Sequence, residues 1–129
     1  MKFNKQEIFD KVYDHLHAQG RKSVIYEHRD KQINCRYRAP NGDKCAIGCL
    51  IPDELYTPSI EGNNVQSYNV KKILYQLYPD HMTSNDLLFL IHLQEAHDVI
   101  DGSNFISHLN DVMEDIALNW ILRFRKKCT

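Results

Sequence analysis

Apolar residues at the start of the chain recur with the spacing of an amphipathic helix. The apolar positions from Ile8 to Leu16 fall on one face of a helix with about 3.6 residues per turn. Asn4 is a good N-cap residue, and Gly20 is a good residue for a helix end. We therefore expect a helix over about residues 4–19.

The hydrophobic pattern then changes to a period of two, which is typical of a half-buried strand. The segment 40–43, Pro-Asn-Gly-Asp, is a strong turn signal. The apolar run 45–51 fits either a strand or a helix, and the turn before it favours a strand that pairs back on 33–38. Residues 23–26 are expected to add a third short strand. The alternating residues are, in order, Ile33, Asn34, Cys35, Arg36, Tyr37 and Arg38.

The second half of the chain is mainly helical in its pattern. Residues 53–56 fit one helical turn, and residues 57–64 have the composition of a loop. The predicted fold class is α+β, with an N-terminal helix, a central β-hairpin or small antiparallel sheet, and three C-terminal helices. We expect one globular domain over residues 1–129. The three helices are expected to begin near Ser67, at Thr83 or Ser84, and at Ser103 or Asn104, and to end near Leu77, Asp98 and Phe124.

Length and composition are those expected of one soluble intracellular domain. The 129 residues are 43% hydrophobic and 26% charged, so the chain can form a core. No apolar run reaches the ~20 residues that a membrane-spanning helix needs. The charged N-terminus is unlike a signal peptide. We therefore expect a cytoplasmic protein without membrane contact.

The net charge of −1 combines segments of opposite sign. Residues 21–44 carry seven basic and three acidic side chains, whereas residues 45–119 carry two basic and eleven acidic ones. Such segments either pair in the folded chain or create a one-sided field. Nucleic acid is a weak candidate partner because nucleic-acid-binding proteins are usually basic overall. A DNA-binding regulator that uses the basic tail, residues 123–127, is a further alternative.

The cysteines are candidates for metal binding or for nucleophilic chemistry. Cys35, Cys45 and Cys49 lie close in sequence, and with His28 they form a less favoured zinc candidate. Structural zinc sites usually hold two ligand pairs with short spacing, and only Cys45 and Cys49 approach that spacing. A nucleophilic Cys45 would need His97 beside it. We therefore expect buried cysteines that act as small apolar residues, with no cofactor and no metal.

The dipeptide His97-Asp98 closes the second of the three C-terminal helices, and two interpretations remain open. A histidine at that end of a helix is stabilised by the helix dipole. The same dipeptide occurs in metal-dependent phosphohydrolases, so a small hydrolase using His92, His97 and Asp98 is the alternative function. The His-Glu-x-x-His spacing of zinc proteases is absent.

The segment 35–62 is the most distinctive part of the chain, because it combines arginine, tyrosine, asparagine and acids in a loop-rich region. Arg36 and Arg38 would project from one strand face, where guanidinium groups suit a phosphate, a nucleotide or an acidic protein surface. An unusual structural hairpin is the other interpretation. The candidate binding residues are Arg36, Tyr37, Arg38, Lys44, Asp53, Glu54, Tyr56, Glu61, His97 and Asp98.

This segment also resembles a group of small proteins of tailed phages and bacterial mobile elements. The shared pattern is CxYRxxxGxKCAxGxLIPDExYxPxxEG over residues 35–62, followed by LQxxHD over residues 93–98. The resemblance implies an origin in a phage or mobile element. The group has no assigned activity, so no mechanism follows from the resemblance.

We predict a non-catalytic binding module, an accessory protein that inhibits a host defence system or sequesters one of its ligands. The expected partner is a host protein or a small anionic ligand, bound by the hairpin and the loop 53–61. A homo-oligomer is expected because a chain of this size offers limited binding surface alone. The expected location is the cytoplasm of the bacterial host.

Overall fold

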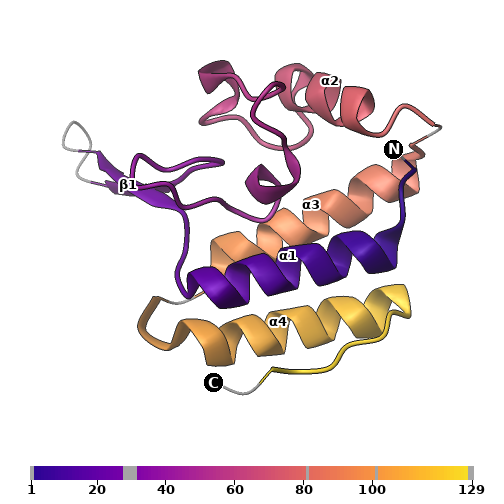
Figure 1. The fold of residues 1–129 in the computed structure, drawn as a ribbon. Helices are drawn as coiled ribbons and strands as arrows, with labels where there is room; N and C mark the ends of the chain where they lie inside the picture. Colours follow the sequence, from indigo (N-terminus) through magenta and orange to yellow (C-terminus); the bar gives the residue numbers. More distant parts are fainter. Residues whose placement is uncertain (1, 28–31, 81, 101, 128–129) are drawn as a thin grey trace.

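The computed structural model describes residues 2–27, 32–80, 82–100 and 102–127 (Figure 1). These residues form four α-helices and a two-stranded antiparallel sheet, which confirms the predicted α+β class. The helices are α1 (Lys5–Gln19), α2 (Tyr68–Leu77), α3 (Ser84–Val99) and α4 (Phe105–Trp120). The strands are β1 (Val24–Glu27) and β2 (Gln32–Cys35), and the short 3₁₀-helices are η1 (Gly48–Leu50), η2 (Pro58–Ile60) and η3 (Gly102–Asn104).

Local capping interactions explain where two of the predicted helices begin and end. The Asn4 side chain accepts a hydrogen bond of 3.0 Å from the backbone N–H of Glu7. Gly20 ends α1 with a left-handed φ of 74°, a conformation that glycine adopts without strain. Thr83 and Asp86 form a reciprocal capping box at the start of α3.

The three long helices α1, α3 and α4 pack against one another as a bundle. Figure 1 shows α1, α3 and α4 side by side, with α2 and the irregular segment before it on the opposite side of α1 and α3 from α4. Burying one large apolar side chain contributes about 1.5–3 kcal/mol, so the side chains buried within this bundle stabilise the fold. Fully buried side chains between the helices include Phe9, Phe89, Leu93 and Leu109.

The C-terminal segment 122–127 contacts α1 through hydrogen bonds to Gln6 and to the Tyr13 hydroxyl. Phe124 packs edge-on against two aromatic side chains of α1, with ring centroids 5.6 and 4.9 Å apart. The backbone of Arg123 exchanges two hydrogen bonds with the Gln6 side chain, at 2.9 and 3.0 Å. The basic tail is therefore docked on α1.

The strand pairing differs from the prediction. β2 pairs with β1 in an antiparallel register that begins with Val24 opposite Cys35. The short strand expected near residues 23–26 therefore forms, as β1, and it is the strand that pairs with β2. The predicted pairing of 33–38 with 45–51 is wrong. Next to the 40–43 turn, Arg38 forms an isolated bridge with Lys44, and the Cys45 N–H bonds to the Tyr37 carbonyl at 3.3 Å, but no strand ladder continues into 45–51 within these fully described segments.

Burial on all sides explains why 45–51 is not a strand. Six of its seven residues are buried, whereas the predicted hairpin strand would have exposed alternate side chains. The segment instead forms a turn and η1, in which the Cys49 N–H bonds to the Cys45 carbonyl at 3.0 Å. The backbone at Gly48 lies against Tyr37, where a methyl group would overlap the carbonyl oxygen.

Residues 52–67 connect η1 to α2 with little regular structure. The predicted helical turn at 53–56 is a hydrogen-bonded turn, closed by the Tyr56 N–H and the Pro52 carbonyl at 3.2 Å. The predicted loop 57–64 contains η2. Within the described ranges, no helix has the length and apolar character needed to cross a bilayer.

Candidate functional site

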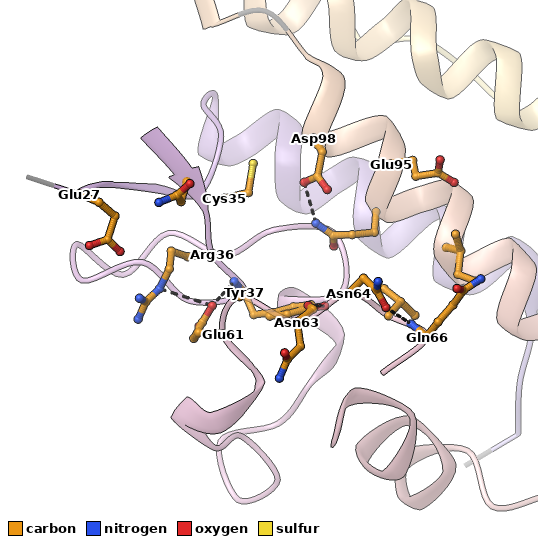
Figure 2. Close-up of a pocket in the computed structure, with 15 residues that line it drawn as sticks. Glu27, Cys35, Arg36, Tyr37, Glu61, Asn63, Asn64, Gln66, Glu95 and Asp98 are labelled. Atoms are coloured by element: carbon orange, nitrogen blue, oxygen red, sulfur yellow. Dashed lines mark hydrogen bonds and ion pairs between the residues drawn. The ribbon is translucent and has the colours of Figure 1, made fainter. Parts of the chain in front are cut away.

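A pocket of about 760 Å³ lies between the end of β2, the loop 61–66 and α3 (Figure 2). We call it the hairpin–α3 pocket. Four of the predicted binding residues line it, namely Arg36, Tyr37, Glu61 and Asp98. Its lining also includes Glu27, Asn34, Cys35, Asn63, Asn64, Gln66, Gln94 and Glu95. The fold thus brings two distant segments with predicted binding residues to one site.

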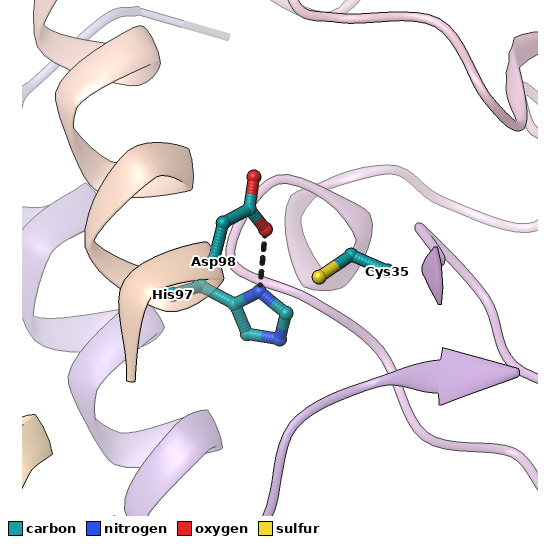
Figure 3. Close-up of side chains that lie close together, drawn as sticks. All are labelled: Cys35, His97 and Asp98. Carbon is teal, nitrogen blue, oxygen red and sulfur yellow. Dashed lines mark hydrogen bonds and ion pairs between the residues drawn. The ribbon is translucent and has the colours of Figure 1, made fainter. Parts of the chain in front are cut away.

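His97 lies behind the pocket wall and is completely buried. Its Nε2 atom accepts a hydrogen bond of 3.1 Å from the backbone N–H of Ser23. Because that N–H can only donate, Nε2 carries no proton, and Nδ1–H of the neutral ring donates to Asp98 Oδ1 at 2.9 Å. Figure 3 shows this contact beside the Cys35 thiol. His97 therefore ties the end of α3 to the segment before β1.

Asp98 presents an ionised carboxylate to the pocket. Its Oδ1 atom also accepts a hydrogen bond of 2.9 Å from Gln94, whose own oxygen accepts the Ile47 N–H at 3.0 Å (Figure 2). Burial acts to raise the pKa of Asp98, but hydrogen bonds from His97, Gln94 and Cys35 outweigh it and lower the pKa. The side chain is 42% exposed, so the carboxylate is both charged and accessible.

Glu61 is a structural centre of the opposite wall. One carboxylate oxygen accepts the Tyr37 N–H at 2.9 Å. The other oxygen accepts the Arg38 N–H at 3.0 Å and the Tyr56 hydroxyl at 2.7 Å. The Arg36 guanidinium lies 3.4 Å from the first oxygen, and the Glu61 side chain is only 8% exposed. Glu61 thus fixes the backbone after β2 to the loop before α2.

The two arginines predicted to face a ligand are held by contacts within the chain. Arg36 pairs with Glu61, as described above. The Arg38 guanidinium pairs with Asp53 at 2.8 Å and donates to the Ile51 carbonyl at 2.9 Å. It also stacks on the Tyr56 ring, 4.5 Å from the centroid. Arg38, Asp53 and Tyr56 therefore form an ion-pair cluster around Glu61, outside the pocket lining.

Two other predicted binding residues lie away from the pocket. Glu54 is exposed on the turn 53–56. The backbone of Lys44 binds the Gln19 side chain through its N–H, at 2.9 Å, and its carbonyl accepts from His15 and Gln19. Lys44 lines a second hollow, of about 420 Å³, beside α1.

The cysteines of the zinc candidate do not face a common point. Cys45 is buried, and its sulfur accepts the Gly48 N–H at 3.3 Å. Cys49 donates to the Ala46 carbonyl at 3.1 Å, whereas Cys35 faces Asp98. His28 lies outside the described residues.

The three thiols also lack the activation that a nucleophile needs. Burial raises the pKa of Cys35, and the Asp98 charge raises it further. Burial raises the pKa of Cys45 as well, and that of Cys49 to about 12. These thiols therefore remain protonated at neutral pH.

Cys35, His97 and Asp98 are the one group within the described part of the chain whose ligand atoms lie close enough to share a metal ion, within 4.8 Å. The tautomer of His97 argues against such a site. A metal on Nδ1 would place the proton on Nε2, directly opposite the Ser23 N–H that now donates to it. These residues therefore do not fit a metal.

The hydrolase alternative also required His92 near His97. His92 instead packs on Trp120 and accepts its indole N–H at 3.2 Å. The fold uses the two histidines for different contacts, one to α4 and one to the segment before β1. The geometry offers this alternative no support.

The carboxamides of the pocket were missed as candidate binding residues. The sequence predicts a loop over 57–64 and a helix start near Ser67, and no binding role was expected for Asn63, Asn64 or Gln66, although such a group of carboxamides is typical of a polar surface. Gln94 and Glu95 are on α3 and were not candidates because their partners are distant in sequence. Comparison with known proteins adds nothing to this geometry, since no family model, curated protein or solved structure matches the chain.

Proposed function

We propose that this chain is a non-catalytic binding module whose small-molecule ligand occupies the hairpin–α3 pocket. The proposal includes an accessory role in a phage or mobile element, directed at a host defence system. That part rests on the resemblance of residues 35–62 and 93–98 alone.

Polar groups left without protein partners in the pocket carry the proposal. Within the described residues, the side chains of Asn34 and Glu95 line the pocket but form no hydrogen bond or ion pair. Asp98 adds a carboxylate that is ionised and 42% exposed, although His97, Gln94 and Cys35 also donate to it. Ligand pockets typically have a few placed polar groups of this kind that fix orientation. A pocket of about 760 Å³ also falls within the usual range for small-molecule sites.

Binding is favoured over the two alternative functions by contacts already described. The histidine and thiols that a hydrolase would use are buried, bonded or protonated. The basic tail that a DNA-binding regulator would use is docked on α1, with Lys127 paired to Asp14 at 2.8 Å and Lys126 to Glu114 at 3.2 Å. Such pairs reduce the positive charge available for phosphates.

The test is a nuclear magnetic resonance titration of the chain with a panel of nucleosides, nucleotides, amino acids and amines. We expect at least one compound to shift backbone amide signals of residues 61–66 and 94–98 saturably. Gln66→Trp should abolish those shifts, because its exposed side chain lines the pocket and the indole would fill it.

Asn119→Trp is the matched control, because it makes the same kind of change on an exposed position of α4, which contributes no residue to the pocket. Shifts that survive Gln66→Trp, or a panel without any saturable shift, would overturn the proposal. Native mass spectrometry of the same samples counts the subunits and so tests the expected homo-oligomer.

A further inference from the structure

Among the described residues, the lining of the hairpin–α3 pocket has an excess of negative charge. These residues include four carboxylates, those of Glu27, Glu61, Glu95 and Asp98, but one guanidinium, that of Arg36. Arg36 is paired with Glu61, so the charges of these two residues largely cancel. The remaining carboxylates lie on the two other walls, one at the end of β1 and two on α3.

In the described part of the chain, Lys22 is a cation close to this pocket, and its contacts limit how far it can neutralise the carboxylates. Its ammonium group donates to the backbone carbonyl of Asp98 at 2.7 Å and contacts the Cys35 thiol. It is therefore held at the end of α3 and is not among the pocket-lining residues. With Lys22 included, the described residues still provide four carboxylates against two cations.

Glu95 and Asp98 form the accessible acidic wall. They are three residues apart on α3, so their side chains share one face of the helix. Glu95 is exposed and has no ion-pair partner in the described residues, and Asp98 is ionised and 42% exposed. Asn34, on β2, also lines the pocket, and its carboxamide has no hydrogen-bond partner in the described residues, so it supplies an acceptor oxygen.

We infer that the pocket binds an organic cation that carries several N–H donors, a guanidinium or a protonated amine, seated against Asp98 and Glu95. The inference rests on the proposed function and names the ligand class of the same site. Carboxylates prefer such donors because charge-assisted N–H···O bonds are stronger than neutral ones. An anionic ligand, the class expected from Arg36 and Arg38 in the sequence, would meet uncompensated carboxylates instead.

Calorimetric titration with agmatine, spermidine, adenosine and adenosine monophosphate tests the ligand class. We expect agmatine or spermidine to bind, and adenosine monophosphate to bind at least about tenfold more weakly than the better cation. Preferred binding of adenosine or its monophosphate at this pocket would overturn the cation inference and leave the proposed function intact. Absence of binding by the whole set, with no response to the wider panel above, would overturn both.

Charge-removing variants locate the cation within the pocket. Asp98→Asn keeps an acceptor oxygen for His97 and Gln94, and Glu95→Gln removes no contact within the described residues, so both should fold. Each should weaken binding of the cation by about tenfold. Asp111→Asn removes the same charge from the exposed surface of α4 and should change binding by less than about twofold, because salt screens distant charges. Equal effects of all three variants would overturn the placement against α3.

Discussion

Replacing Glu61 by glutamine tests whether this residue holds the pocket wall together. The two side chains have nearly the same shape, so Glu61→Gln changes hydrogen bonding and charge without creating a cavity. Both carboxylate oxygens are acceptors in the native contacts, to the Tyr37 and Arg38 N–H groups and the Tyr56 hydroxyl. A glutamine must place its NH₂ group at one of these two positions.

Either orientation of the glutamine removes at least one bond. An NH₂ group at the first position would face the Tyr37 N–H and the Arg36 guanidinium, and at the second it would face the Arg38 N–H. A buried donor without an acceptor costs about 1–3 kcal/mol, and a hydrogen bond to a charged group contributes about 1.5–3 kcal/mol. Loss of the charge also leaves the partly buried Arg36 without its ion-pair partner. We expect Glu61→Gln to lower the free energy of unfolding by about 2–4 kcal/mol.

Urea denaturation measures this change. With a slope of about 2 kcal/mol per molar urea, the midpoint should fall by about 1–2 M while the slope stays constant. Glu95→Gln makes the same chemical change on an exposed side chain and should alter stability by no more than about 0.5 kcal/mol. If Glu61→Gln were as stable as the Glu95→Gln control, the carboxylate would not be the structural centre inferred from its contacts.

Two further predictions concern the close approach at Gly48 and the ion pair at the start of α3. Gly48→Ala should lower the free energy of unfolding by about 2–4 kcal/mol, as measured by thermal unfolding. The added methyl would lie 2.8 Å from the Tyr37 carbonyl carbon, so the two backbone segments would have to move apart. An unchanged melting temperature would refute this contact. Burial acts to raise the pKa of Asp86, but the hydrogen bonds from Lys5 and Thr83 have the larger effect, so folding lowers this pKa. Asp86→Asn should therefore cost stability at pH 7 but progressively less below about pH 4, as the native carboxyl is protonated; equal losses in stability at pH 7 and pH 3 would contradict it.

The helices could be predicted because their signals are local. The Asn4 cap, the Thr83 capping box and the apolar stripes each involve residues within a few positions of one another. Gly20 and the left-handed end of α1 belong to the same class of signal. The observed starts and ends of α1 and α3 therefore fall close to the expected ones.

The hairpin was predicted wrongly because strand pairing depends on competition between distant segments. The Pro-Asn-Gly-Asp turn at 40–43 does form, with the Gly42 N–H bonded to the Ala39 carbonyl at 3.0 Å. The run 45–51 nevertheless enters the core as a turn and η1, and β2 pairs with β1. A short apolar run does not reveal whether one face or all faces will be buried, so its periodicity could not decide between these outcomes.

Residue type helped to identify side chains that line the pocket, but the sequence did not reveal which charged side chains would pair with one another. Tyr37, Glu61 and Asp98 were identified and do line the pocket. Arg36 and Arg38 were expected to face a ligand, but each has a carboxylate partner within the chain. Nothing in the local sequence identifies those partners, since they come from the loop 53–61.

The sign of the pocket follows from the uneven charges along the chain. The basic segment 21–44 meets the acidic segment 45–119 at the hairpin, and their pairing there neutralises the arginines. The acids of α3 have few such partners, because the only basic residues of segment 45–119 are Lys71 and Lys72, which lie on α2 and do not line the pocket. Pairing at one wall therefore leaves uncompensated negative charge at the other. The pairing that occupies the two arginines of the expected anion site thus favours the cation that we infer for this pocket.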